Sequence, residues 1–113
     1  MRELLHAKIH RATVTNVEPE YTGSIGIDEF LLEKADIWEG EKVLISDINN
    51  GARFETYVVR ERAGSGIIAV KGAAARLVSV GDKIIIMAFE VTNAPVEPKV
   101  VIVDDENRFI RYS

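Results

Sequence analysis

Short runs rich in Val and Ile, separated by turn residues, occur along most of this 113-residue chain and indicate a mainly β fold. The clearest example is a predicted hairpin, in which residues 43–48 and 53–60 flank a tight turn at residues 49–51. Further strands are predicted at residues 5–14, 67–70, 84–91 and 99–103. Because closing a sheet removes its exposed edges, this pattern favours a small β-barrel.

One helix is predicted directly after Asp28, whose carboxylate suits the N-cap position. Gly40 is placed to end this helix. The apolar residues at helical spacing are Leu31, Leu32, Ala35 and Trp38.

The length indicates a single domain over residues 1–113, which buries roughly two-thirds of its unfolded surface in one core. Apolar residues make up 47% and charged residues 28% of the chain. Both fractions are ordinary for globular proteins, so the composition excludes disordered and fibrous classes.

Charge and hydropathy narrow the possible partners. The 14 basic and 18 acidic residues leave a net charge of −4, which argues against a nucleic-acid partner. The longest strongly apolar stretch, residues 84–89, is far shorter than the ~20 residues that span a bilayer. Residues 1–4 lack the apolar core of a secretion signal, so a cytoplasmic location is expected. The absence of cysteine excludes disulfides, thiolate catalysis and thiolate metal sites.

A Gly-Ser peptide bond at Gly23-Ser24 is the feature that points to chemistry. A serine hydroxyl that attacks the preceding carbonyl converts the amide to an ester, and elimination followed by hydrolysis leaves an N-terminal pyruvoyl group. A second pair, Gly64-Ser65, lies in a glycine-rich connector and is expected to be a plain hairpin loop. Gly23-Ser24 instead precedes the apolar residues 25–28, where a strand can begin and hold the bond firmly.

Six separated blocks resemble the L-aspartate alpha-decarboxylases, a pyruvoyl-dependent family, in order and approximate spacing. The resemblance covers roughly residues 2–92. The blocks are Lys8-Ile9-His10-Arg11-Ala12, Tyr21-Thr22-Gly23-Ser24, Asn50-Gly51-Ala52-Arg53-Phe54, Thr56-Tyr57, Gly72-Ala73-Ala74-Ala75 and Val80-Gly81-Asp82.

This resemblance implies a six-stranded double-psi β-barrel with one or two short helices, assembled as a homotetramer with active sites at the subunit interfaces. It implies decarboxylation of L-aspartate to beta-alanine and CO2, which feeds pantothenate and coenzyme A biosynthesis. Self-cleavage between Gly23 and Ser24 gives a small chain, 1–23, and a pyruvoyl chain, 24–113. The pyruvoyl group from Ser24 forms a Schiff base with the substrate, so neither pyridoxal phosphate nor a metal is expected.

The resemblance also assigns roles near the scissile bond. Thr56 is expected beside the Gly23 carbonyl, where its hydroxyl donates to the oxyanion during self-cleavage. Gly23 itself is expected in a strained turn, with backbone angles closed to other residues. Tyr57 is the expected proton donor, because a phenol stays protonated at neutral pH.

Substrate binding is assigned to a second group of residues. Arg53 presents a planar fork to a carboxylate and Lys8 adds a positive charge. We expect Arg53 to hold the side-chain carboxylate, because tight binding of the departing α-carboxylate stabilises the ground state. The other implied substrate-binding residues are Tyr21, Gly72, Ala73 and Ala74. The segment that contains these two alanines either gives the substrate room and N–H donors or is a tightly packed helical turn.

Strand geometry sets a difficulty for this assignment. In a regular strand Arg53 and Tyr57 share a face about 13 Å apart, whereas Thr56 points to the other face. Twist, a bulge or a subunit boundary must therefore bring them to one substrate.

The chain departs from the family at Lys71, where the family usually has asparagine. Lys71 is expected to alter the cleavage rate, the preference for substrate charge or local pKa values. His10 also matches the family, without an assigned role. His6 and His10 have a helical metal-binding spacing, but on a strand they lie about 13 Å apart, so no metal site is expected.

Two alternatives remain open from the residues. Beside L-aspartate decarboxylation, these are a pyruvoyl decarboxylase for a different amino acid and a non-catalytic small-barrel module that serves in assembly or binding.

Overall fold

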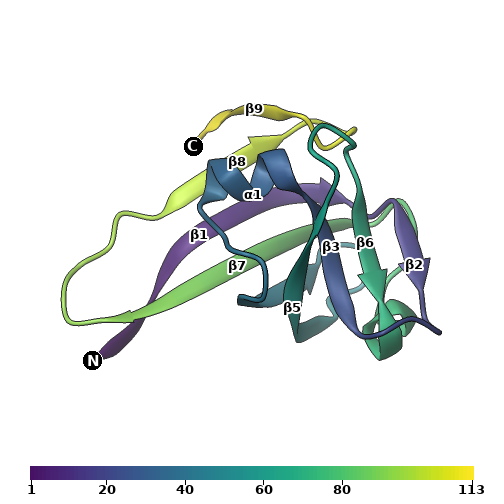
Figure 1. The fold of residues 1–113 in the computed structure, drawn as a ribbon, viewed down its shortest axis with the longest axis horizontal. Coiled ribbons are helices and arrows are strands. Elements are labelled where there is room, and N and C mark those ends of the chain that lie inside the picture. Colours follow the sequence, from purple (N-terminus) through teal and green to yellow (C-terminus); the bar gives the residue numbers. More distant parts are fainter.

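The computed structural model describes residues 1–113 and is mainly β, as predicted (Figure 1). The two helices are α1 (Glu29–Ala35) and the 3-10 helix η1 (Gly72–Leu77). The strands are β1 (Arg2–Thr13), β2 (Asn16–Glu18), β3 (Ser24–Asp28), β4 (Lys42–Asp47), β5 (Arg53–Glu61), β6 (Ile68–Lys71), β7 (Lys83–Thr92), β8 (Lys99–Val103) and β9 (Phe109–Tyr112).

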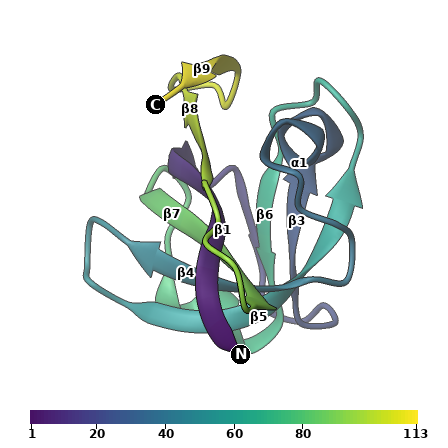
Figure 2. The same cartoon turned by 90° about the vertical axis from the view of Figure 1, so that its left-hand side faces the viewer.

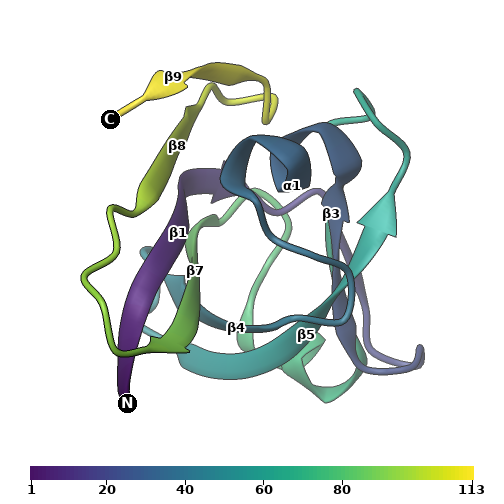
Figure 3. The same ribbon diagram turned by 60° about the vertical axis from the view of Figure 1, so that its left-hand side comes forward.

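Strand pairing closes strands β1 to β7 into a barrel of six segments, in which β1 and β2 together form one segment. Only Val14 and Thr15 separate β1 from β2, so the two strands are successive parts of one extended stretch. β1 pairs antiparallel with β7, and β2 pairs parallel with β6. The row β6-β3-β5-β4-β7 therefore meets the same stretch at both ends and closes around the core (Figure 2). β8 and β9 lie outside this ring, next to β1 and α1 (Figure 3).

The core takes every second residue along β4 and the first part of β7, whereas all of β3 is buried. β4 alternates between buried and more exposed positions, as a half-buried strand requires. Ile9, Ile45, Ile86, Ile25 and Val58 are all fully buried. Each such side chain contributes about 1.5–3 kcal/mol when it leaves water.

The predicted start of α1 is confirmed, and its predicted end is wrong. The Asp28 carboxylate accepts a hydrogen bond from the Phe30 backbone N–H at 2.8 Å, as an N-cap does. The helix ends at Ala35, because Asp36 adopts a left-handed conformation (φ 57°). This turn leads Ile37 into the core and leaves Trp38 74% exposed. Trp38 therefore does not belong to the apolar face of the helix, and Gly40 does not end it.

The predicted hairpin at Gly64-Ser65 is also wrong. β3 lies between β5 and β6 in the sheet, so the loop crosses over β3 and does not join neighbouring strands. The Gly64 and Gly66 backbone N–H groups donate to the Asp28 carboxylate at 2.9 and 2.8 Å. Asp28 thus anchors this crossover while it caps α1. Neither helix has the length and apolar character that crossing a membrane requires.

Candidate active site

Ser24 is the first residue of β3, and strand pairing holds it in place. Its Cα partner on β6 is Lys71, and its side chain is almost fully buried, with 4% of its surface exposed. The Ser24 hydroxyl donates to the Thr22 carbonyl at 3.5 Å. The hydroxyl therefore points back along the chain, across the Gly23-Ser24 bond.

The backbone beside this bond is packed closely against Gly72. Gly72 has φ +79°, and a Cβ there would lie 2.5 Å from the Gly23 Cα and 3.4 Å from the Tyr21 carbonyl oxygen. Real Cβ atoms do not approach backbone so closely, so only glycine fits. The expectation that Gly23 itself has an unusual backbone angle is wrong, because its φ lies outside the left-handed region. The glycine that the backbone conformation requires is Gly72.

The parallel register between β3 and β5 brings two predicted residues level with the Gly23-Ser24 bond. Ile25 is the Cα partner of Val58. Counting back in the same register places Tyr57 level with Ser24, and Thr56 level with Gly23. Tyr57 is 42% exposed, whereas Thr56 is half-buried on the opposite side of β5.

Arg53 shares the outer face of β5 with Tyr57, because both occupy alternate positions with Glu55 between them. The four-residue separation places Arg53 about 13 Å along the strand from Tyr57. The guanidinium of Arg53 has no hydrogen-bond or ion-pair partner within the chain.

Lys8 lies on the same outer face, three strands away. Successive Cα partners connect Lys8 with Met87, Met87 with Leu44, and Leu44 with Glu55. Three strand spacings correspond to about 14 Å between Lys8 and Glu55. The structure therefore places both predicted carboxylate-binding cations on the face that carries Tyr57, but not in contact with Ser24.

Lys71 lies next to Ser24 in a partly enclosed setting. Its ammonium forms an ion pair with the Glu61 carboxylate at 3.2 Å, with 17% and 21% of the two side chains exposed. The same ammonium lies 5.3 Å from the centre of the Tyr21 ring. Sequence reasoning did not identify Glu61, because no local pattern reveals that β3 lies between β5 and β6.

The Gly72-Ala73-Ala74-Ala75 segment forms the first part of η1, so the predicted helical turn is present. Gly72 and Ala75 are buried, Ala74 is half-buried and Ala73 is exposed. Ala73 and Ala74 are therefore at least partly accessible to solvent. Their role in substrate binding remains a prediction.

His10 lies two residues after Lys8 on β1. Burial, together with the positive charges of Arg11 and Lys8, lowers the pKa of His10. His10 is consequently neutral at pH 7. The structure contains no group of three or more His, Cys, Asp or Glu side chains suited to a metal ion.

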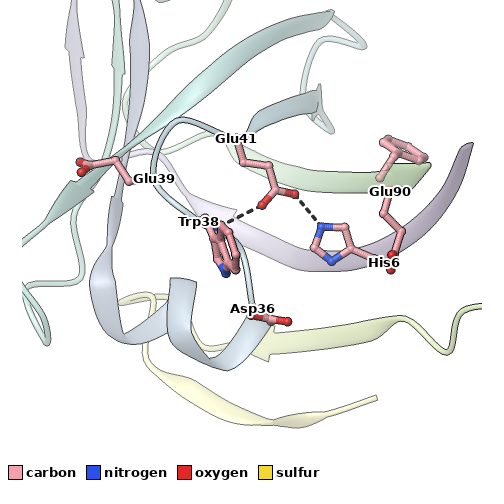
Figure 4. Close-up of a pocket in the computed structure, with 7 residues that line it drawn as sticks. His6, Asp36, Trp38, Glu39, Glu41 and Glu90 are labelled. Carbon is pink, nitrogen blue, oxygen red and sulfur yellow. Dashed lines mark hydrogen bonds and ion pairs between the residues drawn. The ribbon is translucent and has the colours of Figure 1, made fainter. Parts of the chain in front are cut away.

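The largest hollow of the chain lies elsewhere and does not suit an anionic substrate. This cavity, of about 510 Å³, is lined by seven residues (Figure 4). His6 lies at one side, and its Nε2 is 2.6 Å from Glu41, which also accepts from the Trp38 backbone N–H. Four of the lining side chains are carboxylates, which repel an anion. They are Asp36, Glu39, Glu41 and Glu90.

Comparisons with known proteins agree with the resemblance found in the sequence. Residues 1–110 match the family model described as aspartate decarboxylase. The aspartate 1-decarboxylase of Caldicellulosiruptor bescii is 56% identical, with 98% of this chain and 90% of the relative covered. That of Lactiplantibacillus plantarum is also 56% identical, over 96% of this chain and 87% of the relative. That of Bacillus cereus strain G9842 is 50% identical, over 96% and 89%.

Among solved structures, the chain resembles the rationally designed mkDPBB_sym_86 protein with a TM-score of 0.54. The match covers 72% of this chain and 95% of that one at 18% identity, so it bears on the fold alone. It agrees with the double-psi β-barrel that the closed ring of six strands forms. The family match spans nearly the whole chain, including the Gly23-Ser24 bond and the residues beside it, and the chain therefore belongs to the aspartate decarboxylase family.

Proposed function

We propose that the chain cleaves itself between Gly23 and Ser24 and then decarboxylates L-aspartate to beta-alanine and CO2, by means of the pyruvoyl group made from Ser24. The observation that carries this proposal is the tight packing of Gly72 against Gly23, beside a buried serine. A surface turn needs no such close backbone approach. The cytoplasm is the proposed compartment, and pantothenate and coenzyme A biosynthesis the proposed use of the product.

The residues around Ser24 suit a pyruvoyl group at that position. Ser24 begins a paired strand, so the new chain start remains held by β6. When present, the group supplies an electrophilic carbonyl that withdraws electrons from a bound amino acid. The segment that follows Lys71 contributes only small residues here, Gly72, Ala73 and Ala74.

Tyr57 and Thr56 take separate tasks in this proposal. Tyr57 is level with Ser24 and partly exposed, so its phenol can deliver a proton to the substrate carbon after CO2 leaves. Thr56 is level with Gly23 and faces the other way, which suits a role in self-cleavage. Thr56→Ala is expected to remain largely uncut, because it lacks a hydroxyl worth roughly 3 kcal/mol to an oxyanion.

Arg53 and Lys8 are proposed to bind substrate carboxylates, and Tyr21 to flank the site. Both cations project from an open face, and neither has a partner within the chain. The main cavities do not include Ser24, so a single chain does not enclose a substrate there. We therefore propose a homotetramer in which a neighbouring subunit covers this face and completes the site.

Intact mass after expression tests the cleavage. The proposal expects two pieces, of residues 1–23 and 24–113, and a single uncut chain from the matched control Ser24→Ala. Uncut wild-type protein after prolonged warming would instead favour the non-catalytic module. Product analysis with aspartate and with other amino acids then identifies the substrate. Aspartate decarboxylation by a chain whose backbone is intact would contradict the proposal.

A further inference from the structure

The ion pair of Lys71 and Glu61, next to the Gly23-Ser24 bond, has no role in the proposed reaction. Lys71 is the Cα partner of Ser24, so the two side chains leave the same face of the sheet with their Cβ atoms about 4.5–5.5 Å apart. The backbone of Lys71 also lies beside Gly23, since its carbonyl oxygen is 4.0 Å from where a Gly23 Cβ would be.

The fold makes room for the partner of Lys71. A Cβ on Gly26 would overlap the Glu61 side chain, so the missing side chain at Gly26 is what allows Glu61 to cross β3. Glu61 reaches Lys71 from the far side of that strand, at 3.2 Å. The Tyr21 ring covers the ammonium from another side. An ordinary surface lysine has no such enclosure.

The Lys71 ammonium retains unused hydrogen-bonding capacity. Of its three N–H donors, only one has an acceptor, the Glu61 carboxylate. The remaining donors belong to the residue that pairs with Ser24, next to a bond whose proposed cleavage releases a carboxylate.

We propose that Lys71 stabilises the carboxylate that leaves with Gly23 when the ester is eliminated during self-cleavage. This inference rests on the proposed function, since it concerns the same bond. Glu61 forms an ion pair with the ammonium and takes no part in the bond changes.

In the ester, the Ser24 Oγ is joined to the Gly23 carbonyl carbon. The Ser24 Cα proton passes to water, and its electron pair forms the Cα–Cβ double bond. The Cβ–Oγ bond breaks, and its electron pair remains on oxygen, which becomes part of the Gly23 carboxylate. The dehydroalanine then takes up a proton at Cβ and becomes an imine. Water adds to the imine carbon and ammonia leaves, so that the pyruvoyl group remains. Negative charge thus develops on the Gly23 side of the bond, beside Lys71.

The test follows the maturation of freshly purified full-length chains by mass spectrometry, with and without hydroxylamine. Hydroxylamine captures the ester as a hydroxamate on residues 1–23 and leaves residues 24–113 with an N-terminal serine. In Lys71→Met, pyruvoyl formation is expected to slow roughly ten- to a hundredfold, as for loss of one charge-assisted hydrogen bond. The ester should still form, so hydroxylamine should cut this variant and yield the N-terminal serine. Lys71→Arg should mature near the wild-type rate.

Glu61→Gln separates an electrostatic role from a structural one. Removing a negative charge near a developing negative charge favours elimination, so this variant is expected to mature at least as fast as the wild type. Both variants break the same ion pair, and a merely structural pair would slow maturation in both. Lys34→Met is the matched control, because Lys34 is also a half-buried lysine over aromatic rings but lies on α1.

Three outcomes would overturn the inference. The first is that Lys71→Met matures at the wild-type rate. The second is that Lys71→Met and Glu61→Gln are slowed equally. The third is that Lys71→Met is slowed but accumulates no ester that hydroxylamine cleaves. If thermal unfolding shows that Lys71→Met is not folded, the comparison of Lys71→Arg with Glu61→Gln decides: slow maturation of Glu61→Gln overturns the inference. Failure of the wild type itself to cleave would instead remove the proposed function.

Discussion

At the residue scale, Gly72 shows how one missing side chain organises the site. Its φ of +79° and its contact with the Gly23 Cα are both accessible to glycine alone. The segment before Ser24 is therefore held by backbone packing, and a strained angle at Gly23 is not needed. This contact explains why the residue before the three alanines is glycine.

Gly72→Ala should slow self-cleavage at least about tenfold, because the new Cβ displaces Gly23. The measurement is the fraction of cleaved chain over time, by intact mass. Gly51→Ala is the matched control: its φ of +77° is nearly the same, but no atom lies within 4 Å of the added Cβ. Equal cleavage rates in the two variants would show that the close packing is irrelevant.

Tyr57→Phe should still cleave itself but should lose roughly 10²–10⁴-fold in decarboxylation, the range of general acid catalysis. The rate of CO2 release from fully cleaved protein measures this effect. Tyr112→Phe serves as control, since it removes a phenol hydroxyl that donates a hydrogen bond to the Lys34 carbonyl, away from Ser24. Normal turnover by cleaved Tyr57→Phe would exclude Tyr57 as the proton donor.

At the element scale, the end of β4 carries a carboxyl group in an unfavourable setting. Asp47 Oδ1 accepts from the Asn49 and Asn50 backbone N–H groups, whereas the buried Oδ2 has no partner. Burial, and then the neighbouring Asp82 carboxyl, raise the pKa of Asp47. Because the folded pKa exceeds the unfolded one, stability is lost as pH rises from about 4 through the folded pKa.

Asp47→Asn should therefore be more stable than the wild type at pH 7, by on the order of 1 kcal/mol, with a gain that shrinks towards pH 4. The amide oxygen of the variant can still accept hydrogen bonds from the Asn49 and Asn50 backbone N–H groups, and the amide group carries no charge. Thermal unfolding between pH 4 and 7 measures the difference.

Asp104→Asn should change the stability of the fold in the opposite direction. Backbone N–H groups of Arg108 and Glu106 lower the pKa of Asp104, so its stabilising effect is present at neutral pH and is lost as pH falls through the folded pKa. This variant should be less stable than the wild type at neutral pH, and the difference should disappear in acid. The same pH trend in both variants would contradict the assignment for Asp47.

At the scale of the whole molecule, the predicted site is spread over one open face. Ser24 and Tyr57 are level with each other, but Arg53 lies about 13 Å along β5 and Lys8 lies on β1. A small amino acid does not span that surface unaided. A neighbouring subunit that brings its own Arg53 to this face would resolve the difficulty.

Co-expression of Ser24→Ala and Arg53→Ala chains tests this arrangement. If a site combines Ser24 from one chain with Arg53 from another, random mixing should restore about a quarter of the wild-type sites, although each variant alone is inactive. The expected assembly of four 12.6 kDa chains, about 50 kDa, is checked by light scattering. A fully inactive mixed assembly would show that both residues act within one chain.

Local patterns determined much of this protein: the strands of the β4–β5 hairpin, the Asp28 cap and the alternation of β4 all follow from residues adjacent in sequence. The end of α1 did not follow from local pattern. The chain leaves the helix before Ile37 and buries that side chain in the core, whereas Trp38, which has helical spacing, is exposed.

The sequence by itself also determined the family and pointed to Gly23-Ser24 as the proposed cleavage bond, because those motifs are contiguous and chemically specific. Only the tertiary structure decided that β3 enters between β5 and β6, and this placement brings Glu61 to Lys71 and Gly72 to Gly23. Contacts between residues distant in sequence depend on strand order. Strand order is set by how all the strands share one core, and no short segment of the chain contains that information.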